Sequence, residues 1–193
     1  MSSRTHAPIA LVGTALLALA ACAAMNDGAT SSLQALGLHV FAGRGYVVRS
    51  DQGWQAEFPG VPAGALRELG SGSRAMAVTE LELRAEADSR GYRLRVYDGR
   101  ALDAGEREQV RAMAERSTSS WGRVREPRIV REGGLEIHEV VISELTVNPE
   151  HDALQRTFVL GGFIVAAIVI AAQGAGDPSD ARSFFASIRL HET

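Results

Sequence analysis

The stretch Phe158-Val-Leu-Gly-Gly-Phe-Ile-Val-Ala-Ala-Ile-Val-Ile-Ala-Ala172 is the most hydrophobic part of the chain after its N-terminal segment. Its valine, isoleucine and phenylalanine side chains favour β-strands, and Gly161-Gly162 is a two-residue hairpin turn signal. We therefore predict paired strands over Leu154–Leu160 and Phe163–Ala172, the second buried on both faces at the centre of a sheet. The alternative is a membrane hairpin or span, although the stretch is shorter than the roughly 18–20 residues that a spanning helix needs.

Further strands are predicted on both sides of this hairpin, wherever short apolar or alternating runs are bounded by turn residues. Residues 63–74 are rich in glycine and serine and predict a loop, and Asp88–Gly91 predicts a four-residue turn. The additional strand candidates are Gly45–Arg49, Trp54–Phe58, Thr79–Ala85, Tyr92–Tyr97, Arg128–Arg131 and Leu135–Leu145.

The hairpin over residues 79–97 alternates with period two. This pattern places Leu81 and Leu83 on one face and a row of charged residues on the other. The charged residues are Glu80, Glu82 and Arg84, with Arg93 and Arg95 on the second strand in position to pair with the glutamates. Such a row can form a ligand site, but a solvated sheet face is the more ordinary arrangement, and we expect the solvated face here.

Two helices complete the predicted fold. The longer one begins after Asp103, which with Glu106 fits a capping box, and runs to about Ser119 with Val110 and Met113 as core contacts. A short helix capped at Asp177-Pro-Ser-Asp180 passes through Phe184-Phe185 and is closed by Ser187–Leu190. The predicted class is α+β: a single domain with a largely antiparallel central sheet flanked by one long and one short helix.

The N-terminal segment has the pattern of a secretory signal. Arg4 precedes a short apolar run that ends in Leu19-Ala20-Ala21-Cys22. These four residues resemble the lipobox of bacterial lipoproteins, in which the signal peptidase recognises residues such as Leu19, Ala20 and Ala21 and cuts before the cysteine. The alternatives are an uncleaved N-terminal anchor and a cysteine that follows an apolar run by chance.

The lipobox resemblance implies that Cys22 carries diacylglycerol and acyl chains such as palmitate, which hold the protein on a membrane of the bacterial envelope. Ala23 follows Cys22 where the sorting pattern of inner-membrane lipoproteins has aspartate, which favours delivery to the outer membrane over the inner membrane. The expected organisation is a signal peptide over 1–21, a lipidated flexible tether over 22–40 and a domain over 41–193.

Composition excludes several kinds of chemistry. The formal net charge is −3, which argues against nucleic acid as a partner, and all 20 basic residues are arginine, which excludes Schiff-base chemistry and a Walker A loop. A single cysteine excludes an intrachain disulfide and a cysteine-based zinc site. We find no pair of histidines with metal-ligand spacing and no catalytic motif, so we predict no catalytic residues, no cofactor and no metal. The remaining histidines after the signal are His39, His138, His151 and His191.

Three segments in order resemble a broad group of uncharacterised bacterial secreted and lipid-anchored proteins. They are Trp54-Gln-Ala-Glu-Phe-Pro-Gly-Val-Pro62, Tyr92-Arg-Leu-Arg-Val-Tyr-Asp98 and Arg156-Thr-Phe-Val-Leu-Gly-Gly-Phe-Ile-Val165 ending in Ser183-Phe-Phe-Ala-Ser-Ile-Arg-Leu190. Such domains resemble the α/β/α sandwich shared by the PsbP extrinsic subunit of photosystem II and a Ran-GTPase-binding nuclear protein. The resemblance implies a PsbP-like sandwich that binds other proteins, and no catalytic residues carry over. Phe163 and the aliphatic strand after it depart from the tyrosine and polar residues common in this hairpin.

Two classes of function follow from these observations. The expected one is a lipid-anchored envelope protein that is not an enzyme and that binds a protein partner or stabilises a complex. The alternative is an envelope hydrolase whose site is assembled from distant serine, histidine and aspartate residues. A pocket of convergent polar groups with perturbed pKa values would favour the enzyme, whereas an exposed apolar or edge-strand patch would favour binding.

Overall fold

The apolar stretch forms strand β10 (Phe163–Ala172), which lies between β6 (Arg90–Asp98) and β9 (His151–Leu160) in an antiparallel sheet. Gly161 and Gly162 join β9 to β10 with φ angles of 57° and 89°, a region that favours glycine. The side chains from Phe163 to Val169 are all buried. The predicted central strand is therefore confirmed, although β9 begins at His151 rather than at Leu154.

The computed structural model describes residues 33–69, 78–174 and 179–191. Within these ranges the large sheet has seven strands in the order β4-β5-β6-β10-β9-β8-β7, and the additional strands are β4 (Ala63–Leu69), β5 (Val78–Ala87), β7 (Arg123–Glu132) and β8 (Leu135–Ser143). A separate four-stranded sheet has the order β1-β2-β3-β11, with strands β1 (Leu38–Ala42), β2 (Tyr46–Ser50), β3 (Trp54–Phe58) and β11 (Arg189–Leu190).

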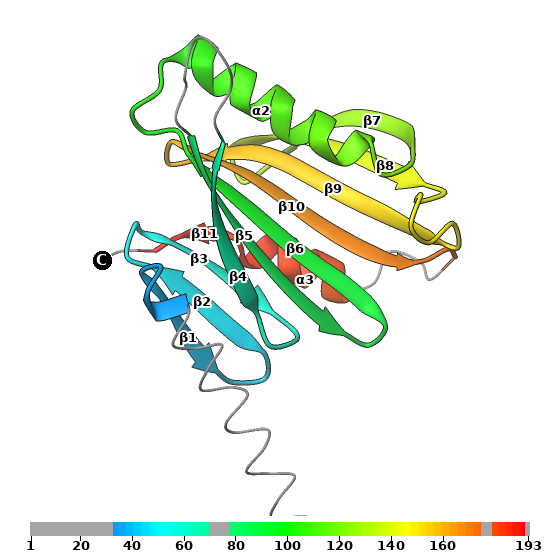
Figure 1. The fold of residues 1–193 in the computed structure, drawn as a ribbon, viewed down its shortest axis with the longest axis horizontal. Helices are drawn as coiled ribbons and strands as arrows, with labels where there is room; N and C mark the ends of the chain where they lie inside the picture. The colour runs from blue at the N-terminus through cyan, green and yellow to red at the C-terminus, as the bar shows by residue number, and fades with distance from the viewer. Residues whose placement is uncertain (1–32, 70–77, 175–178, 192–193) are drawn as a thin grey trace, which may run out of the picture.

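Helix α2 (Ala104–Ser119) covers one face of the large sheet, and helix α3 (Ser179–Ser187) lies with the small sheet on the opposite face (Figure 1). The predicted α+β class with largely antiparallel strands is confirmed. The predicted central sheet is present, but the strands up to Phe58 form with β11 a second sheet that the prediction did not include. Pro59 and Pro62, which cannot donate to a ladder, separate β3 from β4.

The main core lies between the two sheets and α3. Phe184 of α3 is at its middle, with its ring centroid 5.3 Å from that of Phe58 and 5.4 Å from that of Tyr92. These three aromatic rings come from α3, the small sheet and the large sheet respectively, and all are at most 2% exposed. Aromatic packing therefore connects the three layers.

Helix α2 packs on the other face of the large sheet. Val110 and Ala114 are at most 1% exposed and contact the cluster that contains Tyr97 and Ile164, while Met113 is partly buried against it. The predicted capping box is present, because Glu106 N donates to Asp103 Oδ1 at 2.8 Å and Asp103 N donates to Glu106 Oε2 at 2.9 Å. The predicted cap of α3 lies outside the described residues at Asp177 and Pro178, as does the side chain of Asp180.

Part of the predicted loop over 63–74 is a strand. β4 pairs with β5 from Ala63 opposite Arg84 to Leu69 opposite Val78. Gly64 suits this strand because a Cβ there would lie 2.5 Å from a Leu33 methyl group and 2.8 Å from a Leu83 methyl group. Gly64 is therefore not a loop residue: it permits the close approach of two core side chains.

Two other boundaries differ from the prediction. The turn between β5 and β6 has two residues rather than four, because Asp88 and Ser89 adopt φ angles of 49° and 61° that close a tight hairpin. The folded domain also begins before residue 41, since Leu33 is 1% exposed and Leu38 is 0% exposed in the main core. The sequence does not reveal this boundary, because the small and polar residues before the two leucines carry no strand pattern.

No helix in the described part of the chain is long and apolar enough to cross a lipid bilayer.

We expect Phe184→Ala to lower the free energy of unfolding by about 3–5 kcal/mol, because it removes a buried ring shared by three layers. Phe41→Ala is the matched control, since Phe41 is 50% exposed on β1 and should cost less than about 1 kcal/mol. Urea unfolding of the two variants measures both values. Equal losses in the two variants would contradict this description of the core.

Candidate functional site

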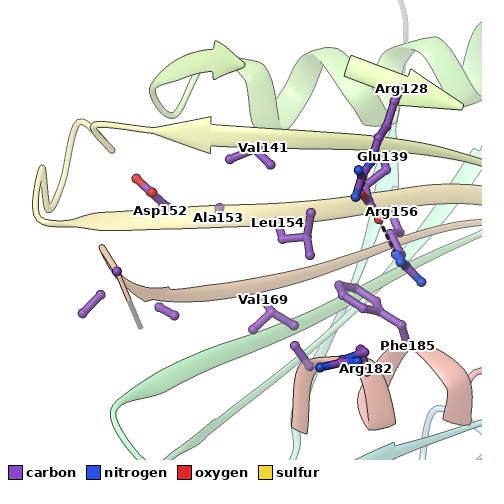
Figure 2. A pocket seen from close by; sticks show the side chains of 14 residues that line it. Arg128, Glu139, Val141, Asp152, Ala153, Leu154, Arg156, Val169, Arg182 and Phe185 are labelled. Atoms are coloured by element: carbon purple, nitrogen blue, oxygen red, sulfur yellow. Dashed lines mark hydrogen bonds and ion pairs between the residues drawn. The ribbon is translucent and has the colours of Figure 1, made fainter. Parts of the chain in front are cut away.

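Two polar regions of the large sheet are the candidate sites, one on each face. The first is a groove between strands β8–β10 and helix α3, which we call the α3 groove (Figure 2). The second is the charged row of the β5–β6 hairpin beneath α2, which we call the α2-face cluster. The predicted lipidation site Cys22 and the recognition residues Leu19, Ala20 and Ala21 lie outside the described residues.

The α3 groove has a volume of about 400 Å³ and an apolar floor that includes Leu154 and Val169. Glu139 lies at one end with a side chain that is only 1% exposed. It accepts hydrogen bonds from Arg128 Nε at 2.6 Å and from Arg156 Nε at 2.7 Å. Figure 2 shows the two arginines approaching the carboxylate from opposite sides, with Phe185 of α3 facing them.

Strand register explains why these three residues meet. Arg128 of β7 is directly opposite Glu139 of β8, and Glu139 is directly opposite Arg156 of β9. Cross-strand neighbours have Cβ atoms about 4.5–5.5 Å apart, so the three charges form a row across three strands. Arg156 also donates to Glu132 at 3.0 Å and lies 4.9 Å from the ring centroid of Phe185. Guanidinium groups stay charged at neutral pH, so this row suits non-covalent binding more than proton transfer.

The α2-face cluster corrects the expected solvated face of the hairpin over 79–97. Glu80, Glu82 and Arg95 are 5%, 2% and 7% exposed, because α2 and the residues after it cover this face. Arg95 donates to Ser117 of α2 at 2.8 Å, and its guanidinium lies 5.2 Å from the ring centroid of Trp121. Alternation correctly predicted which side chains share the face, but it carries no information about what covers them.

Glu82 is the carboxylate that holds this cluster together. Arg84 donates to it at 2.9 Å, and nitrogens of Arg67 and Arg95 lie 3.6 Å from its oxygens. Burial alone would raise the pKa of Glu82, but the hydrogen bond from Arg84 and the charge of Arg95 outweigh it and hold the pKa below its ordinary value. Nearby, burial and then the hydrogen bond to Glu80 raise the pKa of the Tyr97 hydroxyl.

The four histidines are dispersed over the domain. His39 Nε2 is 2.8 Å from Asp51 Oδ1, His138 Nδ1 is 2.8 Å from an Arg111 nitrogen, and His191 Nε2 is 3.1 Å from the Ser50 carbonyl oxygen. His151 lies at the start of β9 with its Nδ1 buried and without a hydrogen-bond partner. His138 and Glu139 occupy opposite faces of β8, because they contact α2 and the α3 groove respectively.

The His39–Asp51 pair is the arrangement nearest to the predicted hydrolase alternative. Ser50 is adjacent in sequence, but it is 3% exposed and directly opposite Leu38, which is 0% exposed. Ser50 therefore lies on the core face of the small sheet, while His39 is on the outer face. Among the described residues, no group of three histidine, cysteine, aspartate or glutamate side chains is placed to hold a metal ion.

The sequence alone did not identify Arg128, Glu139 and Arg156 as a cluster. They belong to three different strands, and nothing in the local sequence fixes the register that brings them together. Comparison of the chain with protein-family models, curated proteins and solved structures finds no match in any of the three.

We expect Glu82→Gln to lower the free energy of unfolding by about 3 kcal/mol near pH 7, because it leaves Arg95 buried beside an uncharged group. The pKa of Glu82 is lowered in the folded state, so its charge stabilises the protein above the unfolded pKa of about 4.3. This contribution is lost as the pH falls through the lower folded pKa. The difference between variant and parent should therefore shrink as the pH falls below about 4.

Urea unfolding between about pH 7 and pH 3 measures this difference. Glu86→Gln is the matched control on the same strand, because Glu86 is exposed and its substitution should cost less than about 0.5 kcal/mol at every pH. A Glu82→Gln deficit that is independent of pH would show that the lost interaction is not with the carboxylate charge.

Proposed function

We propose that this protein is a lipid-anchored protein of the bacterial outer membrane, whose domain binds a protein partner or stabilises a complex and is not an enzyme. The observation that carries the proposal is the distribution of exposed apolar side chains. Within the part of the chain that the structure describes, five of the eight large exposed apolar side chains lie on edge strands of the two sheets, and each of the four edges has at least one. The five are Phe41, Leu66, Val124, Ile129 and Leu190.

Edge strand β7 is the proposed docking surface. It is the longest edge strand, with 10 residues, and it is exposed over nearly its whole length. A bulge between Arg125 and Arg128, which contains Glu126 at a φ of 49°, places one extra residue in β7. Because of this extra residue, Val124 opposite Ile142 and Ile129 opposite His138 fall on the same face of the sheet.

An extended protein segment that pairs with an exposed strand is a common mode of recognition. The part of β7 from Arg128 to Glu132 keeps a regular ladder with β8, so its outer edge can accept such a segment. β7 contains four arginines and two glutamates, which favours a partner segment that alternates apolar and acidic side chains. Proline and charged residues at the middle of β7 would limit indiscriminate pairing.

The proposed anchor fits the start of the domain. Leu33, the first described residue of the core, follows Cys22 by 33 − 22 = 11 positions. Eleven residues span at most about 40 Å when fully extended, so a lipid on Cys22 would keep the domain close to the membrane. Such confinement raises the effective concentration of the domain toward other proteins of the same membrane.

The finer fold assignment belongs to the same proposal. The PsbP-like sandwich is supported by a central antiparallel sheet with α2 on one face and α3 on the other. The resemblance of this chain to proteins with that sandwich is what implies that its domain binds other proteins.

The anchor predicts that Cys22→Ala either releases the protein from the membrane fraction or leaves an unprocessed precursor without lipid. The free thiol is the group that accepts the lipid, so no other residue of the chain can replace the only cysteine. Fractionation of the bacterial envelope and intact-mass measurement test this, with Cys22→Ser as the conservative control that should behave identically. An unchanged mass and unchanged membrane association would refute the anchor.

The docking surface predicts site-specific cross-linking. A photo-reactive residue at position 129 of the full chain in its native envelope should give one discrete adduct, which Arg131→Glu weakens by reversing the charge beside it. Position 61 is the control, because Val61 is 43% exposed just before β4, which lies at the opposite edge of the large sheet from β7. If positions 129 and 61 give the same adducts, β7 is not the docking surface.

A further inference from the structure

An open hollow of about 1150 Å³ lies on the α2 face of the large sheet, at the turn end of the β5–β6 hairpin. The hairpin forms one wall, and Ser120-Trp121 and the loop from Leu145 to Asn148 form the other. Four arginines and two carboxylates line it, namely Arg84, Arg90, Arg93, Arg95, Glu86 and Asp88. When the buried Glu82 below them is counted as a third carboxylate, the four arginines still exceed the carboxylates by one positive charge.

The surplus charge is concentrated at Arg93. Arg93 of β6 is directly opposite Arg84 of β5, and like charges in directly opposite positions destabilise a sheet. Arg84 and Arg95 both use Glu82 as their counter-ion. The ion pairs among the described residues give Arg93 no carboxylate, and its guanidinium instead lies 4.7 Å from the ring centroid of Trp121.

Arg93 is therefore a half-buried cation with too little negative charge around it. Burial, and next the charge of Arg84, lower the pKa of its guanidinium, while Glu82 and Glu86 act in the opposite direction only through longer-range attraction. A second polar group in the same hollow lacks a hydrogen-bond partner. The Nδ1 atom of His151 is buried and makes no hydrogen bond.

We propose that this hollow binds a phosphate group, held between the guanidinium groups of Arg93 and Arg84. Directly opposite residues of two strands have Cβ atoms about 4.5–5.5 Å apart, so both side chains can reach one anion. Each guanidinium presents a planar set of donors that fits phosphate oxygens two at a time. A tetrahedral phosphate offers acceptor oxygens in several directions, which suits arginines that approach from two strands better than a planar carboxylate does.

The size and lining of the hollow indicate that the phosphate is part of a larger molecule. The space far exceeds one phosphate, and apolar side chains such as Leu145 and Ile170 line it beside the arginines. A soluble phosphoester and the headgroup of a phospholipid share the required chemistry. This inference goes beyond the proposed function, because it depends neither on the lipid at Cys22 nor on a protein partner at β7.

The test is calorimetric titration of the full chain in a nonionic maltoside detergent with inorganic phosphate, with acetate as the planar comparison at equal ionic strength. We expect phosphate to bind and Arg93→Gln to weaken it by about tenfold or more, since a charge-assisted contact is lost. Arg44→Gln removes the same charge from an exposed position in the turn between β1 and β2 and should leave the affinity within about twofold. Arg84→Gln is a second variant that should also weaken binding, and its Tm without phosphate is measured beside it because Arg84 also pairs with the buried Glu82.

Thermal unfolding separates a binding role of Arg93 from a purely structural one. Phosphate should raise the Tm of the parent and leave the Tm of Arg93→Gln unchanged. Without phosphate, the Tm of Arg93→Gln should be at least as high as that of the parent. Titration with dihexanoyl phosphatidic acid and with glycerol 3-phosphate then identifies the molecule that supplies the phosphate group. Tighter binding of the phosphatidic acid assigns a lipid headgroup, whereas equal binding of the two assigns a soluble phosphoester. Equal phosphate affinity of Arg93→Gln and the parent, or no heat and no change in Tm at about 10 mM phosphate, would overturn the proposal.

Discussion

The burial of β10 on both faces is the constraint on which the rest of the structure depends. Its backbone groups are satisfied by β6 and β9, but its aliphatic side chains project to both sides and must all leave water. Helix α2 covers the even-numbered face through Ile164 and Ala166, and α3 with the small sheet covers the odd-numbered face through Phe163 and Val165. A strand of this composition therefore requires a layer on each side. The aromatic ring of Phe184 connects the large sheet to the second sheet, because it packs against both Tyr92 and Phe58.

The same double coverage explains why charged residues are buried in this protein. Strands beside β10 alternate apolar and polar side chains, and wherever a covering layer extends over them the polar ones lose water as well. Buried charges are tolerated only when they are paired. Glu139 is paired with Arg128 and Arg156 on one face, and Glu82 with Arg84 and Arg95 on the other. Arg93 is the place where this pairing is incomplete, which is why a ligand site is inferred there.

Local sequence predicted the features that depend on neighbouring residues. The Gly161-Gly162 turn, the strand Phe163–Ala172 and the capping box at Asp103 each follow from residues a few positions apart, and each is present. Features that depend on distant chain segments were missed. The strand at Ala63–Leu69 exists because β5 pairs with it, and Leu33 is part of the core because Gly64 leaves room for it. Glu82 is buried where the side chains of Arg67, Arg84 and Arg95 from three strands converge on it. The α3 groove needs the register of three strands, which no local pattern supplies.

Hydrogen exchange of the backbone amides tests the double burial of β10 most directly. Amides in the middle of a strand that is paired on both edges and covered on both faces exchange only when the whole domain unfolds. We predict that those of Val165 to Ile168 are among the slowest in the protein and report the global free energy of unfolding, whereas those of edge strand β7 exchange much faster. Exchange in β10 as fast as in β7 would contradict a central, doubly covered strand.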